Sequence, residues 1–284
     1  MANLKEIRNR IGSVSSTMQI TSAMKMVSAA KLKKAQDAIT AMRPYSNKLT
    51  QMLVNLSSSI DFENIYLKPR KAENLLVVCI TSNRGLCGAF NSNIIKKCFD
   101  LADNHEGNTS FFCIGKKGAD ILSKNHNVID SNNEIFDELS FEKVSLIAEV
   151  LMKKYTEKEV DSIQIVYNKF KNAATQIVML EQYLPIENTV TENNQKESAD
   201  YIFEPSKIEI ISELIPKSLR TQLFKSIRDS YASEHGARMT AMHKATDNAT
   251  ELRDQLKLTY NKARQAAITN EILEIVGGAE ALNS

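Results

Sequence analysis

The N-terminal stretch of the chain is almost free of residues that break helices. Residues 3–57 contain one glycine, Gly12, and one proline, Pro44. Glycine and proline are the least favourable residues inside a helix. This stretch therefore predicts one long helix over residues 3–57.

The C-terminal stretch has the same character. No proline follows Pro216, and Gly236 is the one glycine before Gly277 and Gly278. Glycine is common just after the last turn of a helix, so the pair predicts a helix end there. We expect a helix over about 210–276, which would be roughly 100 Å long.

Both stretches carry a regular seam of apolar and small residues. In the N-terminal stretch, residues at alternating intervals of three and four are Leu4, Ile7, Ile11, Val14, Met18, Thr21, Lys25, Ser28, Leu32, Ala35, Ile39 and Met42. In the C-terminal stretch they are Met242, Ala245, Ala249, Leu252, Leu256, Thr259, Ala263, Ala266, Asn270 and Leu273. A repeat of 3.5 residues is typical of a coiled coil. We expect the two helices to pair with each other in antiparallel orientation; pairing with other chains is the alternative.

The seam is weakest where Thr21, Lys25 and Ser28 replace large apolar residues. Met24, Met26 and Val27 lie beside it in the sequence. Apolar residues displaced from the seam suggest a second contact surface at this level of the helix.

The middle of the chain predicts an α/β domain with a mostly parallel, helix-covered sheet of Rossmann-like type. Expected strands are residues 74–82, 110–114, 161–170 and 175–184, the last two as a hairpin; expected helices are 89–102, 115–123 and 141–155, and 189–200 is expected to be a polar surface loop. The fold class is therefore α/β with a long two-helix coiled coil. The expected domains are an N-terminal helix over 1–58, an α/β domain over 70–205 and a C-terminal helix over 207–284.

Charge is unevenly distributed along the chain, although the net charge is only +2. Residues 1–48 carry a net charge of +7 and residues 49–216 one of −7. A basic N-terminal arm suggests a negatively charged partner. No apolar run reaches the length of a membrane span, and the first residues lack the apolar stretch of a signal peptide.

The sequence shows no catalytic constellation. The turn Gly85–Gly88 and the segment Gly115–Gly118 match neither the GxxxxGK[ST] nor the GxGxxG phosphate-binding pattern, so we interpret both as structural turns. The four histidines lack paired metal-ligand spacing, and the four cysteines at 79, 87, 98 and 113 include no CxxC pair. We predict no catalytic, cofactor-binding or metal-binding residues, and a reducing compartment.

Four sequence blocks together resemble the gamma subunit family of rotary, F-type ATP synthases. They are KEIRNRI…ITSAMKMVSAAKLKKAQ (5–36), SNRGLCG (82–88), VYNKF (166–170) and SEHGARMTAMHKATDNA…YNKARQAAITNEILEIVGGAEAL (233–282). They occur in the family's order and cover nearly the whole chain. The resemblance implies a non-catalytic central rotor stalk that couples ion flow through the membrane c-ring to ATP synthesis or hydrolysis.

The resemblance also implies partners. The coiled coil would stand inside the ring of alpha and beta subunits, and the α/β domain would lie near epsilon and the c-ring. The complex would lie at the cytoplasmic face of a bacterial inner membrane. No cofactor, nucleic acid or direct small-molecule substrate is implied.

The resemblance further implies subunit-contact residues, which are Met24, Lys25, Arg84, Arg238, Gln265, Thr269 and Glu271. Lys25 departs from family members that carry an acidic residue there. With antiparallel pairing, Met24 is expected to lie close to Arg238 and to Gln265–Glu271. These residues should touch the surrounding ring.

A second class of function remains open from the residues alone. A basic coiled coil could serve as a scaffold or bind nucleic acid through its phosphates. The basic arm lacks interleaved aromatic residues, which single-stranded nucleic acid binders use for stacking.

Overall fold

The computed structural model describes residues 4–57, 65–68, 70–71, 73–186, 204 and 206–283. The predicted polar loop over 189–200 lies outside these residues. The chain forms two compact units, one made from the two ends of the sequence and the other from the continuous segment between them. Met1–Ser28 and Met239–Ser284 form one, called the coil unit below; Ala29–Arg238 forms the other, called the α/β unit.

Two long helices dominate the secondary structure, as predicted. Helix α1 spans Leu4–Ser57, with Pro44 inside it, and α5 spans Lys207–Asn283, with Pro216 inside it. The predicted helix end at Gly277 and Gly278 is wrong, because α5 continues through both glycines. No atom lies within 4 Å of where a Cβ would stand on either residue, so close packing does not explain them.

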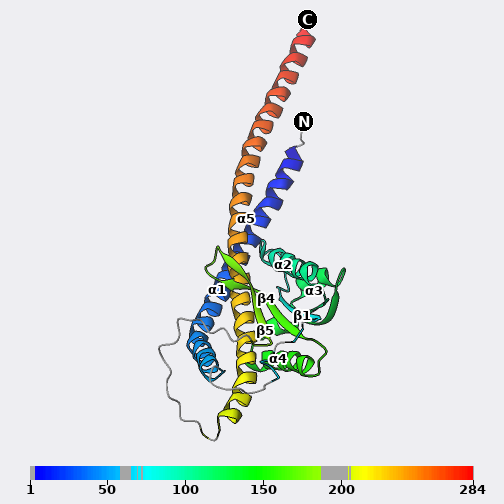
Figure 1. Ribbon diagram of the computed structural model, residues 1–284. Helices are drawn as coiled ribbons and strands as arrows, with labels where there is room; N and C mark the ends of the chain where they lie inside the picture. Colours follow the sequence, from blue (N-terminus) through cyan, green and yellow to red (C-terminus); the bar gives the residue numbers. More distant parts are fainter. Residues whose placement is uncertain are drawn as a thin grey trace. The chain divides into compact units, whose positions relative to one another are not determined.

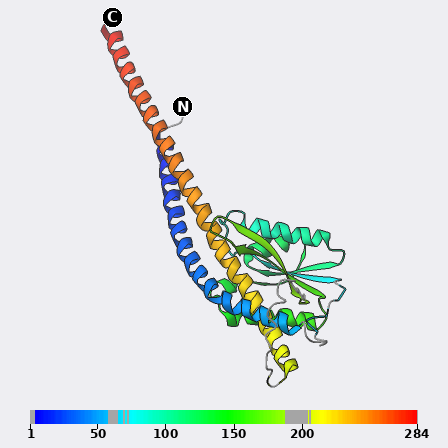
Figure 2. The ribbon, with the colours of Figure 1, turned by 60° about the vertical axis from the view of Figure 1, so that its left-hand side comes forward.

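In the coil unit, α1 and α5 run antiparallel, which confirms the predicted pairing (Figure 2). Three contacts set the register. The Arg8 guanidinium donates to the Tyr260 hydroxyl at 3.2 Å. The Arg253 guanidinium donates to the Met18 sulfur at 3.5 Å. The Thr246 hydroxyl donates to the Thr21 hydroxyl at 2.8 Å. Residue numbers rise along α1 as they fall along α5.

The N-terminal seam is confirmed, since each of its predicted positions from Leu4 to Met42 is buried or half-buried. The C-terminal seam is correct at its start but shifts further on. Leu252 is 40% exposed and Thr259 is exposed, whereas Arg253 and Tyr260 are half-buried. A helix with 3.6 residues per turn drifts against a 3.5 repeat, so the facing position moves to the following residue.

The α/β unit contains one five-stranded sheet in the order β3-β2-β1-β4-β5. The strands are β1 (Asn74–Ile80), β2 (Asn108–Ile114), β3 (Asn127–Asn132), β4 (Ser162–Phe170) and β5 (Gln176–Leu184). All neighbours pair in parallel except β4 and β5, which form the predicted antiparallel hairpin. The mostly parallel sheet is confirmed; β3 and the short 3-10 helix η1 (Glu134–Phe136) are additions.

Helices cover both faces of this sheet (Figure 1). Helices α2 (Phe90–Asn104) and α3 (Lys116–Leu122) lie on one face, and α4 (Phe141–Thr156) lies on the other. Alternate strand residues feed two cores: Val77 and Phe111 belong to the α2 side, and Leu76 and Phe112 to the α4 side.

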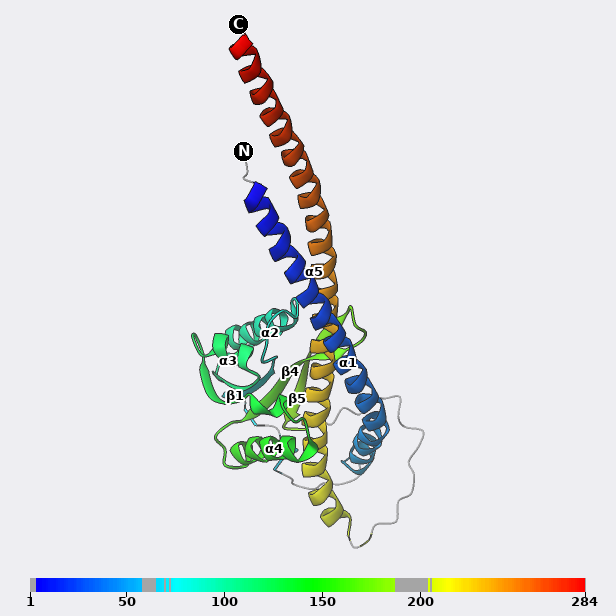
Figure 3. The same cartoon turned by 180° about the vertical axis from the view of Figure 1, so that it is seen from behind.

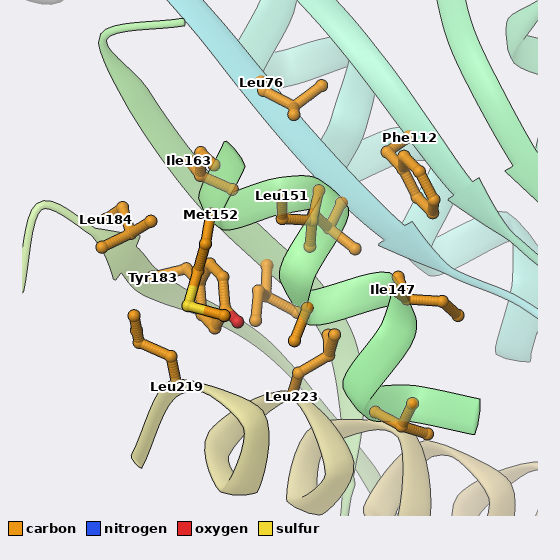
Figure 4. Packing of buried hydrophobic residues seen from close by; sticks show 14 of the residues in the cluster. Leu76, Phe112, Ile147, Leu151, Met152, Ile163, Tyr183, Leu184, Leu219 and Leu223 are labelled. Atoms are coloured by element: carbon orange, nitrogen blue, oxygen red, sulfur yellow. The ribbon is translucent and has the colours of Figure 1, made fainter. Parts of the chain in front are cut away.

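Helix α5 completes the second core. Leu219 and Leu223 point toward Tyr183 and toward Met152 of α4 (Figure 4), and all four side chains are at most 6% exposed. Further along α5, a Cβ at Gly236 would stand 3.3 Å from Ala173, so the missing side chain lets the backbones approach. None of the described helices has the length and apolar character needed to cross a membrane.

Candidate subunit-contact surfaces

The seven predicted contact residues are divided between the two units. Met24, Lys25, Gln265, Thr269 and Glu271 lie in the coil unit, whereas Arg84 and Arg238 lie in the α/β unit. Each group is described within its own unit.

Met24 flanks the buried seam of α1. It is half-buried, as is Lys25, and its carbonyl accepts a hydrogen bond from the Ser28 hydroxyl at 2.8 Å. The neighbouring apolar residues are far more open: Met26 is 65% exposed and Val27 58%. Together with Ile20, which is 60% exposed, they form an apolar outer face on α1. Apolar side chains are therefore exposed at the level of the helix where a second contact surface is expected.

Gln265, Thr269 and Glu271 are exposed on α5. The Thr269 hydroxyl donates to the carbonyl of Gln265 at 2.9 Å, within the same helix. Because Arg8 already meets Tyr260, these residues lie at or beyond the start of α1 (Figure 3).

The expected closeness of Met24 to Gln265–Glu271 is therefore wrong. Thr21, three residues before Met24, pairs with Thr246. Gln265 lies 19 residues further along α5, which at 1.5 Å per residue is roughly 28 Å. In this register the residues of α5 opposite Met24 are those near Thr246, because α5 extends past the start of α1.

The final turns of α5 carry an apolar surface that sequence reasoning missed. Five large apolar residues between 48% and 66% exposed lie there: Ile268, Ile272, Leu273, Ile275 and Val276. Their 3–4 spacing was visible in the sequence. Only Leu273 belongs to the predicted seam. Because Arg8 lies beside Tyr260, no described residue of α1 lies opposite these last turns.

In the α/β unit, the turn Ser82–Gly88 joins β1 to α2 and is tied from several sides. The Ser82 hydroxyl donates to the Arg84 carbonyl at 2.7 Å, and the Asn91 amide donates to the Ser82 hydroxyl at 2.8 Å. Leu86 and Gly88 have φ values of 63° and 59°, in the left-handed region. Leu86 is 64% exposed. A bulky residue held in this conformation is costly, so the surrounding bonds must enforce it.

Arg238 connects α5 to this turn. Its guanidinium donates to the Arg84 carbonyl at 2.9 Å and to the Gly85 carbonyl at 3.3 Å, and pairs with the Glu234 carboxylate at 2.6 Å. The residue is only 7% exposed. Two of the predicted contact residues are thus brought together, since Arg238 holds the backbone of Arg84, while the Arg84 side chain remains exposed.

Glu234 was not predicted, although its spacing of four residues before Arg238 could have indicated it. Burial raises the pKa of its carboxyl, and the charges of Arg238, Lys31 and Arg84 oppose that rise. The three nearby cations therefore offset only part of the cost of burying this carboxylate.

His235 lies beside this pair and is 5% exposed. Neither ring nitrogen has a hydrogen-bond partner among the described residues, and the ring stands edge-on to Tyr231 with centroids 4.4 Å apart. Burial, with the nearby Arg238 and Lys31 charges, lowers the pKa of His235 to about 3. The imidazole is neutral at physiological pH.

The four cysteines are free thiols and all are buried. Burial raises the pKa of Cys87, and hydrogen bonding with Cys113 and Cys98 raises that of Cys79 well above its usual range. A raised pKa disfavours the thiolate, the reactive form of cysteine. The described residues contain no cluster of three or more His, Cys, Asp or Glu that could hold a metal ion.

These features define a class of protein built to contact other chains. Its coil unit exposes apolar residues on the outer face of α1 and on the last turns of α5, and its α/β unit presents a rigidly held turn. A model of the ATP synthase family matches residues 3–282. The chain belongs to this family.

Proteins of similar sequence align with this chain along its whole length. The chain is 67% identical to the ATP synthase gamma chain of Flavobacterium johnsoniae and 64% identical to that of Christiangramia forsetii, with 100% of both chains covered in each comparison. Among solved structures, the mitochondrial ATP synthase rotor of Euglena gracilis has a TM-score of 0.69 at 22% identity, covering 93% of this chain and 98% of that one. The central stalk and c-ring structure from Tetrahymena thermophila gives 0.61 at 26% identity, covering 80% and 99%.

Proposed function

We propose that this chain is the central rotor stalk of an F-type ATP synthase. In this role it couples ion flow through the membrane c-ring to ATP synthesis or hydrolysis in the ring of alpha and beta subunits. The observation that carries the proposal is the antiparallel coil unit with apolar residues left uncovered on α5. Relatives that match the chain from end to end bear the name ATP synthase gamma chain.

The coil unit has the surface that a rotating element needs. Its outer face near Met24 and its last turns on α5 present Ala, Met, Ile and Val rather than dense charge. Apolar contacts are non-directional, so they can shift from one partner surface to the next without deep energy wells. The basic N-terminal arm suits acidic loops of the beta subunits.

The predicted contact residues of the two units are proposed to make different contacts. Met24, Lys25, Gln265, Thr269 and Glu271 would face the alpha and beta ring from the coil unit. In the α/β unit, the exposed Arg84 side chain would make a contact, and Arg238 would position the turn that carries it. We further propose that residues 1–58 and 207–284 serve together as the shaft, and that 70–205 serves as the part that meets epsilon and the c-ring.

The chain itself is proposed to be non-catalytic. The sequence lacks the GxxxxGK[ST] pattern with which nucleotide phosphates are commonly cradled. Nucleotide chemistry would then belong to the partner subunits. The complex is proposed to lie at the cytoplasmic face of a bacterial inner membrane, as a peripheral assembly.

Native mass spectrometry of the complex purified through a tag on this chain tests the proposal. We expect one copy of the chain for every three alpha–beta pairs. Self-association without alpha and beta subunits, or a stoichiometry that varies between preparations, would instead favour a basic coiled-coil scaffold. Co-purifying nucleic acid in place of these subunits would favour the nucleic-acid-binding alternative.

A further inference from the structure

The face of the α/β unit formed by α4 and the sheet edge contains a groove to which the proposed function assigns no particular partner. Its volume is about 390 Å³. Phe112 of β2, Ile135 of η1 and Ile147 of α4 line it and are at most 5% exposed. Two further lining residues of α4, Leu146 and Val150, are 64% and 42% exposed.

Leu146 and Val150 are four residues apart, so they lie on one side of α4. Single exposed apolar residues are common on protein surfaces. Here two of them stand in the wall of a groove that has a buried apolar side and a polar side formed by β3 and Glu134, and apolar pockets with a few polar groups are typical binding sites. β3, which forms another wall, is the last strand of the sheet on this side, and its edge has no partner strand among the described residues.

The groove is surrounded by negative charge. Residues 127–151 contain six acidic residues and one Lys or Arg, Lys143. Lys143 also lines the groove; it pairs with Glu138 at 2.8 Å, and this hydrogen bond together with the charges of Glu138, Asp137 and Glu134 raises its pKa. Asp130 and Glu134, which line the groove, make no ion pair with any described residue.

We propose that this groove binds a basic amphipathic segment of another subunit, with a large apolar side chain in the groove and flanking Lys or Arg residues beside Asp130 and Glu134. The apolar walls supply a place for the side chain, and the unpaired carboxylates supply charge complementarity. The inference rests on the proposed function for the source of the partner, which is the same assembly.

Photocross-linking in intact cells tests the proposal. A benzophenone amino acid replaces Val150 in one variant and Ile121 in another. Ile121 is 41% exposed, nearly as much as Val150, but lies on α3 at the opposite face of the sheet. We expect the Val150 variant to cross-link at least about fivefold more to a peptide of another subunit that has an apolar residue flanked by Lys or Arg.

Variants of Asp130 and Glu134 test how much their charges contribute to binding of the partner segment. Asp130→Asn combined with Glu134→Gln should lower the Val150 cross-linking yield roughly threefold or more at low salt, and less at high salt, because salt screens exposed charges. Asp120→Asn, an exposed carboxylate on α3, serves as the matched control and should leave the yield unchanged.

Several outcomes would overturn the proposal: equal yields at Val150 and Ile121, a cross-linked peptide without basic residues, a peptide from a second copy of this chain, or yields insensitive to the charge variants. Co-purification with alpha and beta subunits is scored separately in the same cells. Its loss would contradict the proposed function, whereas assembly without a cross-link would contradict the groove alone.

Discussion

Arg238 is the residue that joins helix α5 to the turn at Ser82–Gly88. One guanidinium satisfies the Glu234 carboxylate and two backbone carbonyls of the turn. Such additional hydrogen bonds offset part of the desolvation cost of a buried ion pair. At the scale of single residues, this buried contact fixes the two carbonyls that directly precede the exposed Leu86.

Replacing Arg238 should therefore lower the free energy of unfolding far more than replacing the cation of an exposed ion pair whose members are also four residues apart. Arg238→Ala leaves the Glu234 carboxylate buried without its cation, and we expect a loss of about 3–5 kcal/mol in the free energy of unfolding. Lys153→Ala is the control, since Lys153 pairs with Glu157 at 3.7 Å on the surface; it should cost less than about 1 kcal/mol. Urea denaturation followed by circular dichroism measures both.

A second substitution separates the charge from the packing. Arg238→Ala combined with Glu234→Gln removes the uncompensated carboxylate, so the double variant should be more stable than Arg238→Ala alone. If Arg238→Ala and Lys153→Ala cost the same, the buried pair does not hold the turn.

His235 predicts a pH dependence of stability. Its pKa is lowered to about 3 in the folded chain, whereas an unfolded histidine titrates near 6.5. Between these values the unfolded state binds the extra proton, so stability falls as the pH drops through this window. His235→Phe keeps an aromatic ring against Tyr231 and removes the titration. The variant should gain about 2 kcal/mol relative to wild type between pH 7 and pH 5.

Urea titrations of both proteins at several pH values measure this difference. Parallel stability curves for the variant and the wild type from pH 7 to pH 5 would show that His235 does not titrate as the buried ring implies.

The sequence could predict these single residues only in part. Arg238 was identified by resemblance, and Glu234 could have been found from its spacing. The acceptors in the turn could not, because the carbonyls of Arg84 and Gly85 are backbone atoms with no signature of their own. Leu86 also gave no signal, since its left-handed backbone is imposed by neighbours rather than by its own preference.

At the scale of elements, buried and periodic segments were predicted well. β1 is a continuous apolar run with six of its seven residues buried, and α1 keeps its seam. β3 was missed because its sequence, NVIDSN, is polar and mostly exposed at the sheet edge. The shift from Leu252 to Arg253 was missed because a long arginine stem can cover apolar surface while its charge reaches solvent.

The helix register gives a direct test of the coil unit. The Thr21 and Thr246 hydroxyls are 2.8 Å apart, so Thr21→Cys combined with Thr246→Cys should form a disulfide within one chain. The native cysteines are buried and should not compete. Gln19→Cys with Asn248→Cys, both exposed, is the control and should not form an intramolecular bridge. Non-reducing gels at low protein concentration distinguish the products, and disulfide-linked dimers alone would contradict antiparallel pairing.

At the scale of the whole molecule, the domains predicted from the sequence and the two compact units divide the chain at different places. The sequence prediction separated the helices from the α/β domain at residues 58 and 207, whereas the compact units divide both long helices, after Ser28 and after Arg238. Local patterns report helix and strand, but they do not report where a continuous helix changes partners. The contact residues are therefore best tested in the assembled complex.

Met24→Lys tests the proposed rotor surface at that level. Met24 is half-buried beside the seam, and a lysine can extend from this position into solvent, so folding should be little affected. The added cation would lie on the surface proposed to face acidic loops of the beta subunits. A new ion pair of about 1–2 kcal/mol in one rotary position would slow turnover roughly 5–30-fold. We expect normal assembly with poor coupling of ATP hydrolysis to ion pumping.

Met26→Lys is the comparison variant that locates the contact around the helix, because it adds the same charge two residues further along α1, on the outer face that also carries Ile20 and Val27. Met26 is 65% exposed and points to a different side of the helix. ATP-driven ion pumping into membrane vesicles, divided by the rate of ATP hydrolysis, measures coupling for both variants. Stronger uncoupling by Met26→Lys would move the contact to the outer face formed by Ile20, Met26 and Val27. Wild-type coupling in the Met24→Lys complex would show that Met24 is not a contact, although the rotor role itself would stand.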